Sequence, residues 1–123
     1  MVFNNDKPIY LQIVDIICTS ILSGEYKPNE RIPALREFSA QLEVNINTVI
    51  RSLEYLQLNE IIYNKRGLGF FVSDNALESI KAVRRKVFLE QTIPGVVQEM
   101  KVLGITWEEV MAISGDKTPD GKA

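Results

Sequence analysis

The sequence predicts an α+β fold that is mainly α-helical, with a short β-hairpin near its middle. Three observations support this prediction. Apolar residues recur at helical spacing before Gly24, two further helical stretches follow with a short break between them, and two short runs of β-branched and aromatic residues then flank a glycine-containing turn. With 123 residues, 46% of them hydrophobic, the chain fits one small globular domain with an appendage.

The first helix is predicted to begin near Pro8 and to end just before Gly24, because proline suits the first turn of a helix and glycine suits its end. The apolar residues of this segment cover a wide stripe, so we expect burial on more than one side. A short extended piece should precede Pro33, since proline pushes the residue before it toward β geometry. We expect a strand of a single rung at Arg31 and Ile32.

Two helices with helix-turn-helix spacing are predicted next. The first should run from Ala34 to Leu42, and the second should open at Asn45, which is a good N-cap. From Val49 onward the apolar residues of the second helix recur at i, i+4 and i+7. The polar residues of its first turn are therefore free to face outwards.

Residues 61–63 and 70–72 predict the two strands of a hairpin with a basic, glycine-containing tip. The order helix, strand, helix, helix and two-stranded wing is that of a winged helix-turn-helix, which we place at residues 1–73. In that fold one helix enters the major groove of DNA, and the wing approaches the neighbouring groove or the phosphates. The sequence thus predicts a DNA-binding domain.

The candidate DNA-contacting residues lie on the two helices and at the wing tip. Amide and guanidinium side chains can pair with base edges, and a helix N-terminus favours a phosphate. The alternative for each charged residue is an ordinary solvated surface charge, and for the N-cap asparagine a purely structural role. The candidates are Arg36, Asn45, Asn47, Thr48, Arg51, Lys65, Arg66 and Gly67.

Residues 74–115 are predicted to form a helical dimerisation arm. An apolar stripe along its first helix predicts a dimer interface made by Leu77, Ile80, Val87 and Phe88, with the lining of a small-molecule pocket as the alternative. We expect Pro94 to interrupt this helix.

The end of the arm should contain two further helices. One begins at Pro94 and ends at Gly104, and Thr106 with the glutamate three residues later has the spacing of a capping box that opens the last helix. Residues 116–123 are expected to form a flexible tail.

Composition argues against several other classes of protein. The chain has no histidine, so with a single cysteine it offers neither a cluster of metal ligands nor a nucleophile with a partner base, and we expect no enzyme, metal site or cofactor. Cys18 lies in the apolar pattern of the first helix and should be a core residue. No apolar run is long enough to cross a bilayer, so we expect no membrane association and a cytoplasmic location.

Four segments resemble the motifs of GntR-family transcription regulators. Residues 31–38 (RIPALREF) resemble the family's R-[LI]-P-S-x-R-E-L segment, and residues 44–51 (VNINTVIR) resemble V-N-P-N-T-V-x-R. Residues 65–72 (KRGLGFFV) resemble the G-x-G-x-F-V wing, and residues 8–13 (PIYLQI) resemble the P-I-Y-x-Q-I helix start. The motifs span residues 7–73 in the family's order and spacing.

The short arm resembles that of the YtrA-type branch of this family. The resemblance implies a homodimer formed through the arm, and the regulated operons of that branch often encode membrane transporters. The chain departs from the family pattern at Ala34, where serine is usual, and at Ile46 and Ile50, where polar or basic residues often stand. Ile50 either packs on a thymine methyl group or belongs to the core.

The sequence therefore predicts a sequence-specific DNA-binding regulator that acts as a homodimeric repressor of its own operon. Its expected partners are double-stranded DNA with a palindromic operator and a second copy of the chain. The alternative is a winged-helix module that binds another protein, which the formal net charge of −2 keeps open. The sequence defines neither the operator nor an effector site.

Overall fold

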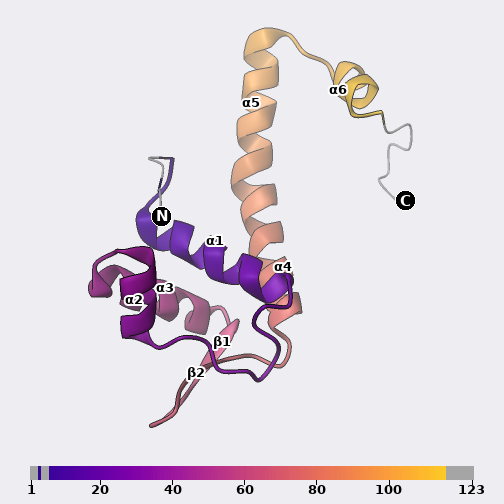
Figure 1. The fold of residues 1–123 in the computed structure, drawn as a ribbon. Helices are drawn as coiled ribbons and strands as arrows, with labels where there is room; N and C mark the ends of the chain where they lie inside the picture. Colours follow the sequence, from indigo (N-terminus) through magenta and orange to yellow (C-terminus); the bar gives the residue numbers. More distant parts are fainter. Residues whose placement is uncertain (1–2, 4–5, 116–123) are drawn as a thin grey trace. The chain divides into compact units, whose positions relative to one another are not determined.

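The computed structural model describes residue 3 and residues 6–115, which belong to two compact units, one ending at Arg84 and the other beginning at Arg85 (Figure 1). The predicted fold class is confirmed, since the described part is mainly helical with one two-stranded sheet. The expected tail at residues 116–123 lies outside the described residues.

The first unit opens with α1 (Ile9–Leu22), α2 (Leu35–Leu42) and α3 (Ile46–Leu58). Helices α1 and α2 begin and end within a residue or two of their predicted bounds, and α3 begins directly after its predicted N-cap. Three residues separate α2 from α3, as helix-turn-helix spacing requires. Glu43 turns the chain there with a left-handed φ of 56°, and its N–H donates to the carbonyl oxygen of Ser39.

The wing follows as an antiparallel hairpin of β1 (Ile62–Lys65) and β2 (Gly69–Val72). Its tip projects beyond the helices of the first unit (Figure 1). The single-rung strand that the sequence predicts is present, because Arg31 forms an isolated bridge with Phe71 and the N–H of Ile32 donates to a β2 carbonyl oxygen at 3.0 Å. This rung joins the segment before α2 to the wing.

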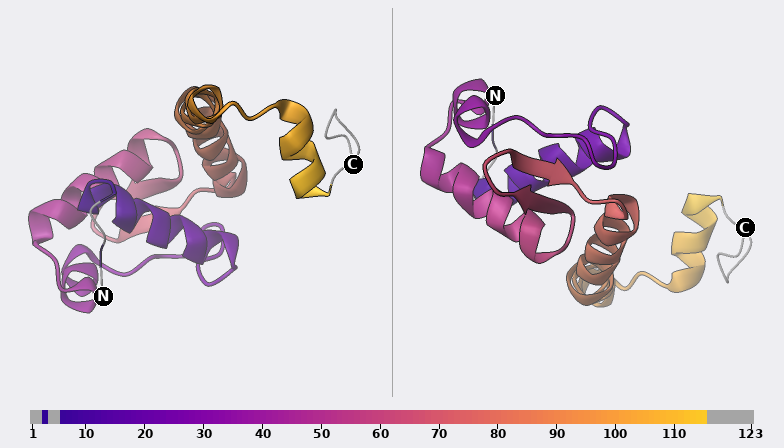
Figure 2. Two further views of the ribbon diagram at one scale, coloured as in Figure 1. Left: turned by 90° about the horizontal axis from the view of Figure 1, so that it is seen from above. Right: turned by 90° about the horizontal axis from the view of Figure 1, so that it is seen from below.

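The core of the first unit lies around α3, which packs against α1, α2 and β1. Helices α1 and α3 lie side by side in the views of Figures 1 and 2. Ser52 is buried with the apolar residues, and its hydroxyl donates to the carbonyl oxygen of Tyr10 at 2.8 Å. The apolar core residues of the three helices are Ile13, Val14, Ile17, Cys18, Ile21, Phe38, Leu42, Val49, Leu53 and Leu56.

Helix α4 (Ala76–Val87) begins inside the first unit. Ala76 and Ile80 are buried in the same core, and the compact unit extends to Arg84. The expectation that Ile80 lies in a dimer interface is wrong, because its side chain is 1% exposed in the single chain and packs in the core of the first unit.

The second unit contains the π-helical turn η1 (Phe88–Thr92), then α5 (Ile93–Leu103). The predicted interruption at Pro94 is wrong, because helical structure follows without a break from α4 through η1 into α5. Proline lacks an N–H, and its ring crowds the carbonyl four residues earlier. The wider turn of η1, in which the N–H of Ile93 donates to the carbonyl oxygen five residues before it, accommodates Pro94.

The chain ends its described part with α6 (Trp107–Ser114). Gly104 closes α5 with a φ of 69°, as predicted. The capping box is also confirmed, since the Thr106 hydroxyl accepts the N–H of Glu109 at 3.2 Å and the Glu109 carboxylate accepts the N–H of Thr106 at 2.9 Å. Local sequence signals therefore set both ends of the α5–α6 connection.

Candidate nucleic-acid interface

The N-terminus of α3 is held by Asn45. Its side-chain oxygen accepts the N–H of Asn47 at 2.7 Å, so the asparagine is the N-cap that the sequence predicts. Of the two roles expected for Asn45, the structure therefore shows the structural one, the helix cap. The dipole of α3 favours an anion at this end of the helix.

The outward face of α3 begins with the predicted contact residues. Asn47 and Arg51 are exposed, and Thr48 is half-buried. Ile50 is 36% exposed and so does not belong to the core, whereas Ile46 is half-buried. The exposed part of α3 thus carries an amide, a guanidinium and an apolar side chain. These three groups can contact adenine, guanine and the thymine methyl group, respectively.

Arg51 does not extend freely into solvent but lies over the ring of Tyr10. Its guanidinium carbon is 3.9 Å from the ring centroid, which is a cation–π geometry. The Tyr10 ring in turn meets Tyr55 edge to face, with centroids 6.4 Å apart. Burial, with Tyr10 as a smaller cause, raises the pKa of Tyr55, which therefore stays neutral at neutral pH.

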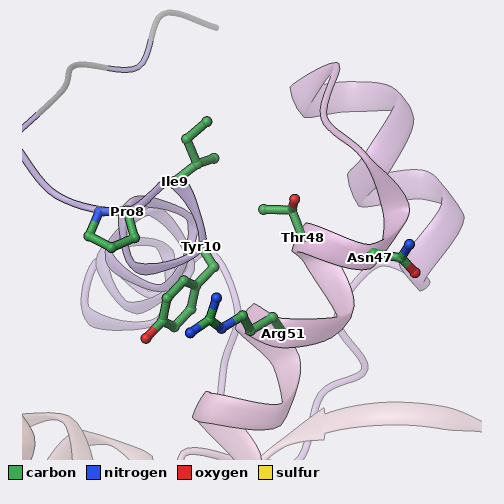
Figure 3. Close-up of a pocket in the computed structure, with 6 residues that line it drawn as sticks. All are labelled: Pro8, Ile9, Tyr10, Asn47, Thr48 and Arg51. Atoms are coloured by element: carbon green, nitrogen blue, oxygen red, sulfur yellow. The ribbon is translucent and has the colours of Figure 1, made fainter.

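An open pocket of about 400 Å³ lies where the first turn of α1 meets the first two turns of α3 (Figure 3). Sequence reasoning missed the contribution of α1 to it. The sequence signal for this contribution is the P-I-Y motif, which predicts the helix start and resembles the family motif but assigned no contact residue. The pocket is lined by Pro8, Ile9, Tyr10, Asn47, Thr48 and Arg51.

The wing tip carries the predicted basic residues in a tight turn. Arg66 is exposed, and Lys65 places its ammonium 4.9 Å from the centroid of the Phe71 ring. The N–H of Leu68 donates to the carbonyl oxygen of Lys65 at 2.8 Å and closes the turn. Gly67 adopts a φ of 79°, which L-residues rarely take.

Arg31 is a further basic residue at the wing that sequence reasoning did not assign. A Cβ atom added at Gly69 would lie 3.1 Å from its Nε, so the guanidinium lies directly against the glycine backbone. Gly69 also has a φ of 110°, a second reason for glycine at this position. The sequence signal for Arg31 is its place in the R-I-P motif, which predicts the single rung and resembles the family motif but assigned no contact to this residue.

Arg36 lies exposed in the first turn of α2. The residue before this helix, Ala34, lacks the hydroxyl of the usual serine and provides no side-chain cap. The carboxylate of Glu37 nevertheless accepts the N–H of Ala34 at 2.8 Å, which preserves one half of a capping box. Helix α2 can therefore form with an alanine at this position.

The described residues hold no group of three or more histidine, cysteine or carboxylate side chains that could bind a metal ion. Nor does the described part of the chain include a helix long and apolar enough to span a bilayer.

Comparison with known proteins places this site in a family. Residues 9–72 match the model of the bacterial regulatory proteins of the gntR family. The chain is 36% identical over 109 residues to the HTH-type transcriptional regulator YhcF of Bacillus subtilis. This alignment covers 89% of this chain and 88% of YhcF. The chain is 32% identical over 84 residues to the HTH-type transcriptional repressor YtrA of the same organism, covering 68% of this chain and 65% of YtrA.

Solved structures agree with this match. A GntR-family transcriptional regulator from Bacteroides thetaiotaomicron is similar with a TM-score of 0.75 and 44% identity, over 87% of this chain and 93% of that one. The AraR DNA-binding domain in complex with operator ORX1 has a TM-score of 0.55 and 26% identity, over 58% of this chain and 93% of that one. The chain therefore belongs to the GntR family of transcription regulators, and its first unit is the winged helix-turn-helix of that family.

Proposed function

We propose that this protein is a sequence-specific DNA-binding repressor that acts as a homodimer on a palindromic operator. The observation that carries the proposal is the face of α3, where Asn47 and Arg51 stand exposed on a helix whose opposite side is buried. Side chains of these types read adenine and guanine in the major groove. The similar AraR domain was solved on its operator, which supports the same use of the fold.

Lys65 and Arg66 at the wing tip and Arg36 on α2 are proposed to contact phosphates or the adjacent groove. All three side chains are exposed. The formal net charge of the whole chain is −2, so attraction to DNA has to come from such local groups. Salt should therefore weaken binding in proportion to the number of phosphate contacts.

Dimerisation is proposed through the helical arm. Leu77, Val87 and Phe88 are exposed apolar side chains, in agreement with a surface that a partner would cover. A twofold dimer places two copies of α3 on half-sites about 34 Å apart, one turn of DNA. The half-sites of the operator should then be inverted repeats.

The proposed target is the operator of the protein's own operon. Genes for membrane transporters are a further proposed target, as the resemblance of the arm to the YtrA-type branch implies. Repression would follow if the bound dimer blocks RNA polymerase. The protein would then act in the cytoplasm, where bacterial DNA lies.

The test is fluorescence anisotropy with the duplex upstream of the protein's own gene and with a scrambled duplex of equal length. We expect tighter binding to the native duplex at two protomers per site. Affinity should fall about 10³-fold or more between 50 and 200 mM salt if six or more phosphates are contacted. Arg51→Ala should cost about 1–3 kcal/mol on the native duplex.

The matched variants are Lys65→Ala with Arg66→Ala, which should weaken both duplexes, and Lys101→Ala, an exposed lysine of the second unit that should leave binding unchanged. Equal weak binding of both duplexes, unaffected by Arg51→Ala, would contradict the proposal. It would instead favour a winged-helix module that binds protein.

A further inference from the structure

We propose that Tyr10 is a positioning residue for base reading, because its ring holds the Arg51 guanidinium in place before DNA arrives. This inference rests on the proposed function. It assigns a recognition role to the first turn of α1, outside the helix-turn-helix and the wing.

The stacking geometry carries the first step. The guanidinium carbon of Arg51 lies 3.9 Å from the Tyr10 ring centroid, and Figure 3 shows the two side chains together at the edge of the pocket. A free arginine side chain has many rotamers, and part of this conformational entropy is lost when it binds a base. A guanidinium already stacked on a ring loses less of it on binding.

The ring itself is fixed to the helix that it serves. Tyr55 of α3 meets the Tyr10 ring edge to face with centroids 6.4 Å apart. The buried hydroxyl of Ser52, also on α3, donates to the carbonyl oxygen of Tyr10 at 2.8 Å. Arg51, Ser52 and Tyr55 of one helix therefore all contact Tyr10, so the ring and the guanidinium keep their relation when α3 enters a groove.

The stacked guanidinium also remains accessible. Arg51 is exposed and lines the open pocket beside Asn47 and Thr48. The part of the structure that is described gives Arg51 no carboxylate within salt-bridge distance. Stacking uses the face of the guanidinium, so its in-plane N–H groups stay available for a bidentate contact with guanine.

A first experiment uses the free full-length protein. Ring current should shift the side-chain Nε–H resonance of Arg51 upfield in the wild type. Tyr10→Phe, which keeps the ring, should retain the shift, and Tyr10→Leu should abolish it. An Arg51 resonance that is the same in the wild type and in Tyr10→Leu would overturn the inference, whether or not the protein binds DNA.

A second experiment measures coupling with a duplex that the wild type selects from a random library. Tyr10→Leu should weaken binding about two- to fivefold, the strength of an exposed cation–π contact. Tyr10→Phe should match the wild type, and Tyr10→Leu should have no further effect once Arg51→Ala is present. Tyr26→Leu, which removes a half-buried tyrosine that packs on the core, is the control for lost packing.

Full additivity of the Tyr10→Leu and Arg51→Ala losses would overturn the positioning role, since the two side chains would then act independently. Selection of no duplex at all would contradict the proposed function instead. In that case the resonance of Arg51 alone decides whether the ring positions the guanidinium.

Discussion

The two compact units of this chain treat their apolar side chains differently. Up to Arg84, residues from every helix and both strands meet in one core. From Arg85 onward, Met100 alone is buried among the residues that the structure describes. Large apolar side chains of the second unit are more than half exposed, among them Val102, Leu103, Trp107 and Ile113.

This difference fits the proposed function, in which the first unit is stable through its own packing and a partner covers the apolar side chains of the second. Burial of apolar surface is the main favourable term in folding, and exposed apolar patches of this kind mark interaction sites. A DNA-binding domain needs a rigid core to present α3. A dimerisation arm needs an apolar surface that is still uncovered before the partner binds.

The strongest way to break the comparison is to truncate one apolar side chain in each unit. Leu53→Ala removes a side chain that is 2% exposed and should lower the free energy of unfolding by about 2–5 kcal/mol. Ile113→Ala removes one that is 87% exposed and should change it by less than about 0.5 kcal/mol. Urea denaturation at low protein concentration measures both, and equal losses would contradict a self-sufficient first unit.

A charge placed on each unit sharpens the same contrast. Phe88→Glu should weaken the dimer by about 2 kcal/mol or more, because a glutamate at the core of an apolar interface has no partner for its charge. Leu58→Glu is the matched control, since Leu58 is 83% exposed in the first unit and is not part of the proposed interface. Sedimentation equilibrium gives both dissociation constants. A dimer unaffected by Phe88→Glu would place the interface elsewhere.

Loss of a helix cap should have a smaller effect, and a different one in each unit. Asn45→Ala should reduce the free energy of unfolding by about 1 kcal/mol, because α3 belongs to the cooperative core. Thr106→Ala removes the equivalent bond to Glu109 but should only loosen α6 locally. Hydrogen exchange distinguishes the two, since the first variant should speed exchange throughout the core and the second only in α6.

Chemical labelling changes no contact and is the mildest probe. Burial raises the pKa of the Cys18 thiol to about 11, so at pH 8 the native protein should hold it protonated and label slowly. Its intrinsic reactivity should rise only as the pH approaches that value. A cysteine introduced by Ile113→Cys in a Cys18→Ala background should label at the rate of a free thiol. Rapid labelling of native Cys18 would show that α1 opens readily.

Local signals in the sequence predicted much of the fold. The caps at Asn45 and Thr106, the glycine after α5 and the rung at Arg31 depend on residues close in the chain, whose preferences act wherever the segment lies. The alternating and helical patterns likewise identified the hairpin and the helix-turn-helix. By itself, the sequence determined the order of elements and predicted that Asn47 and Arg51 lie on the exposed face of α3.

Only the tertiary structure decided which side chains meet across elements. The stack of Arg51 on Tyr10 joins residues 41 positions apart, and the burial of Ile80 depends on a core built by distant helices. The helix through Pro94 depends on a widened turn that no residue pattern announced. Periodicity shows that a helix or strand has an apolar face. It does not show which surface covers that face, because this depends on how the elements pack in three dimensions.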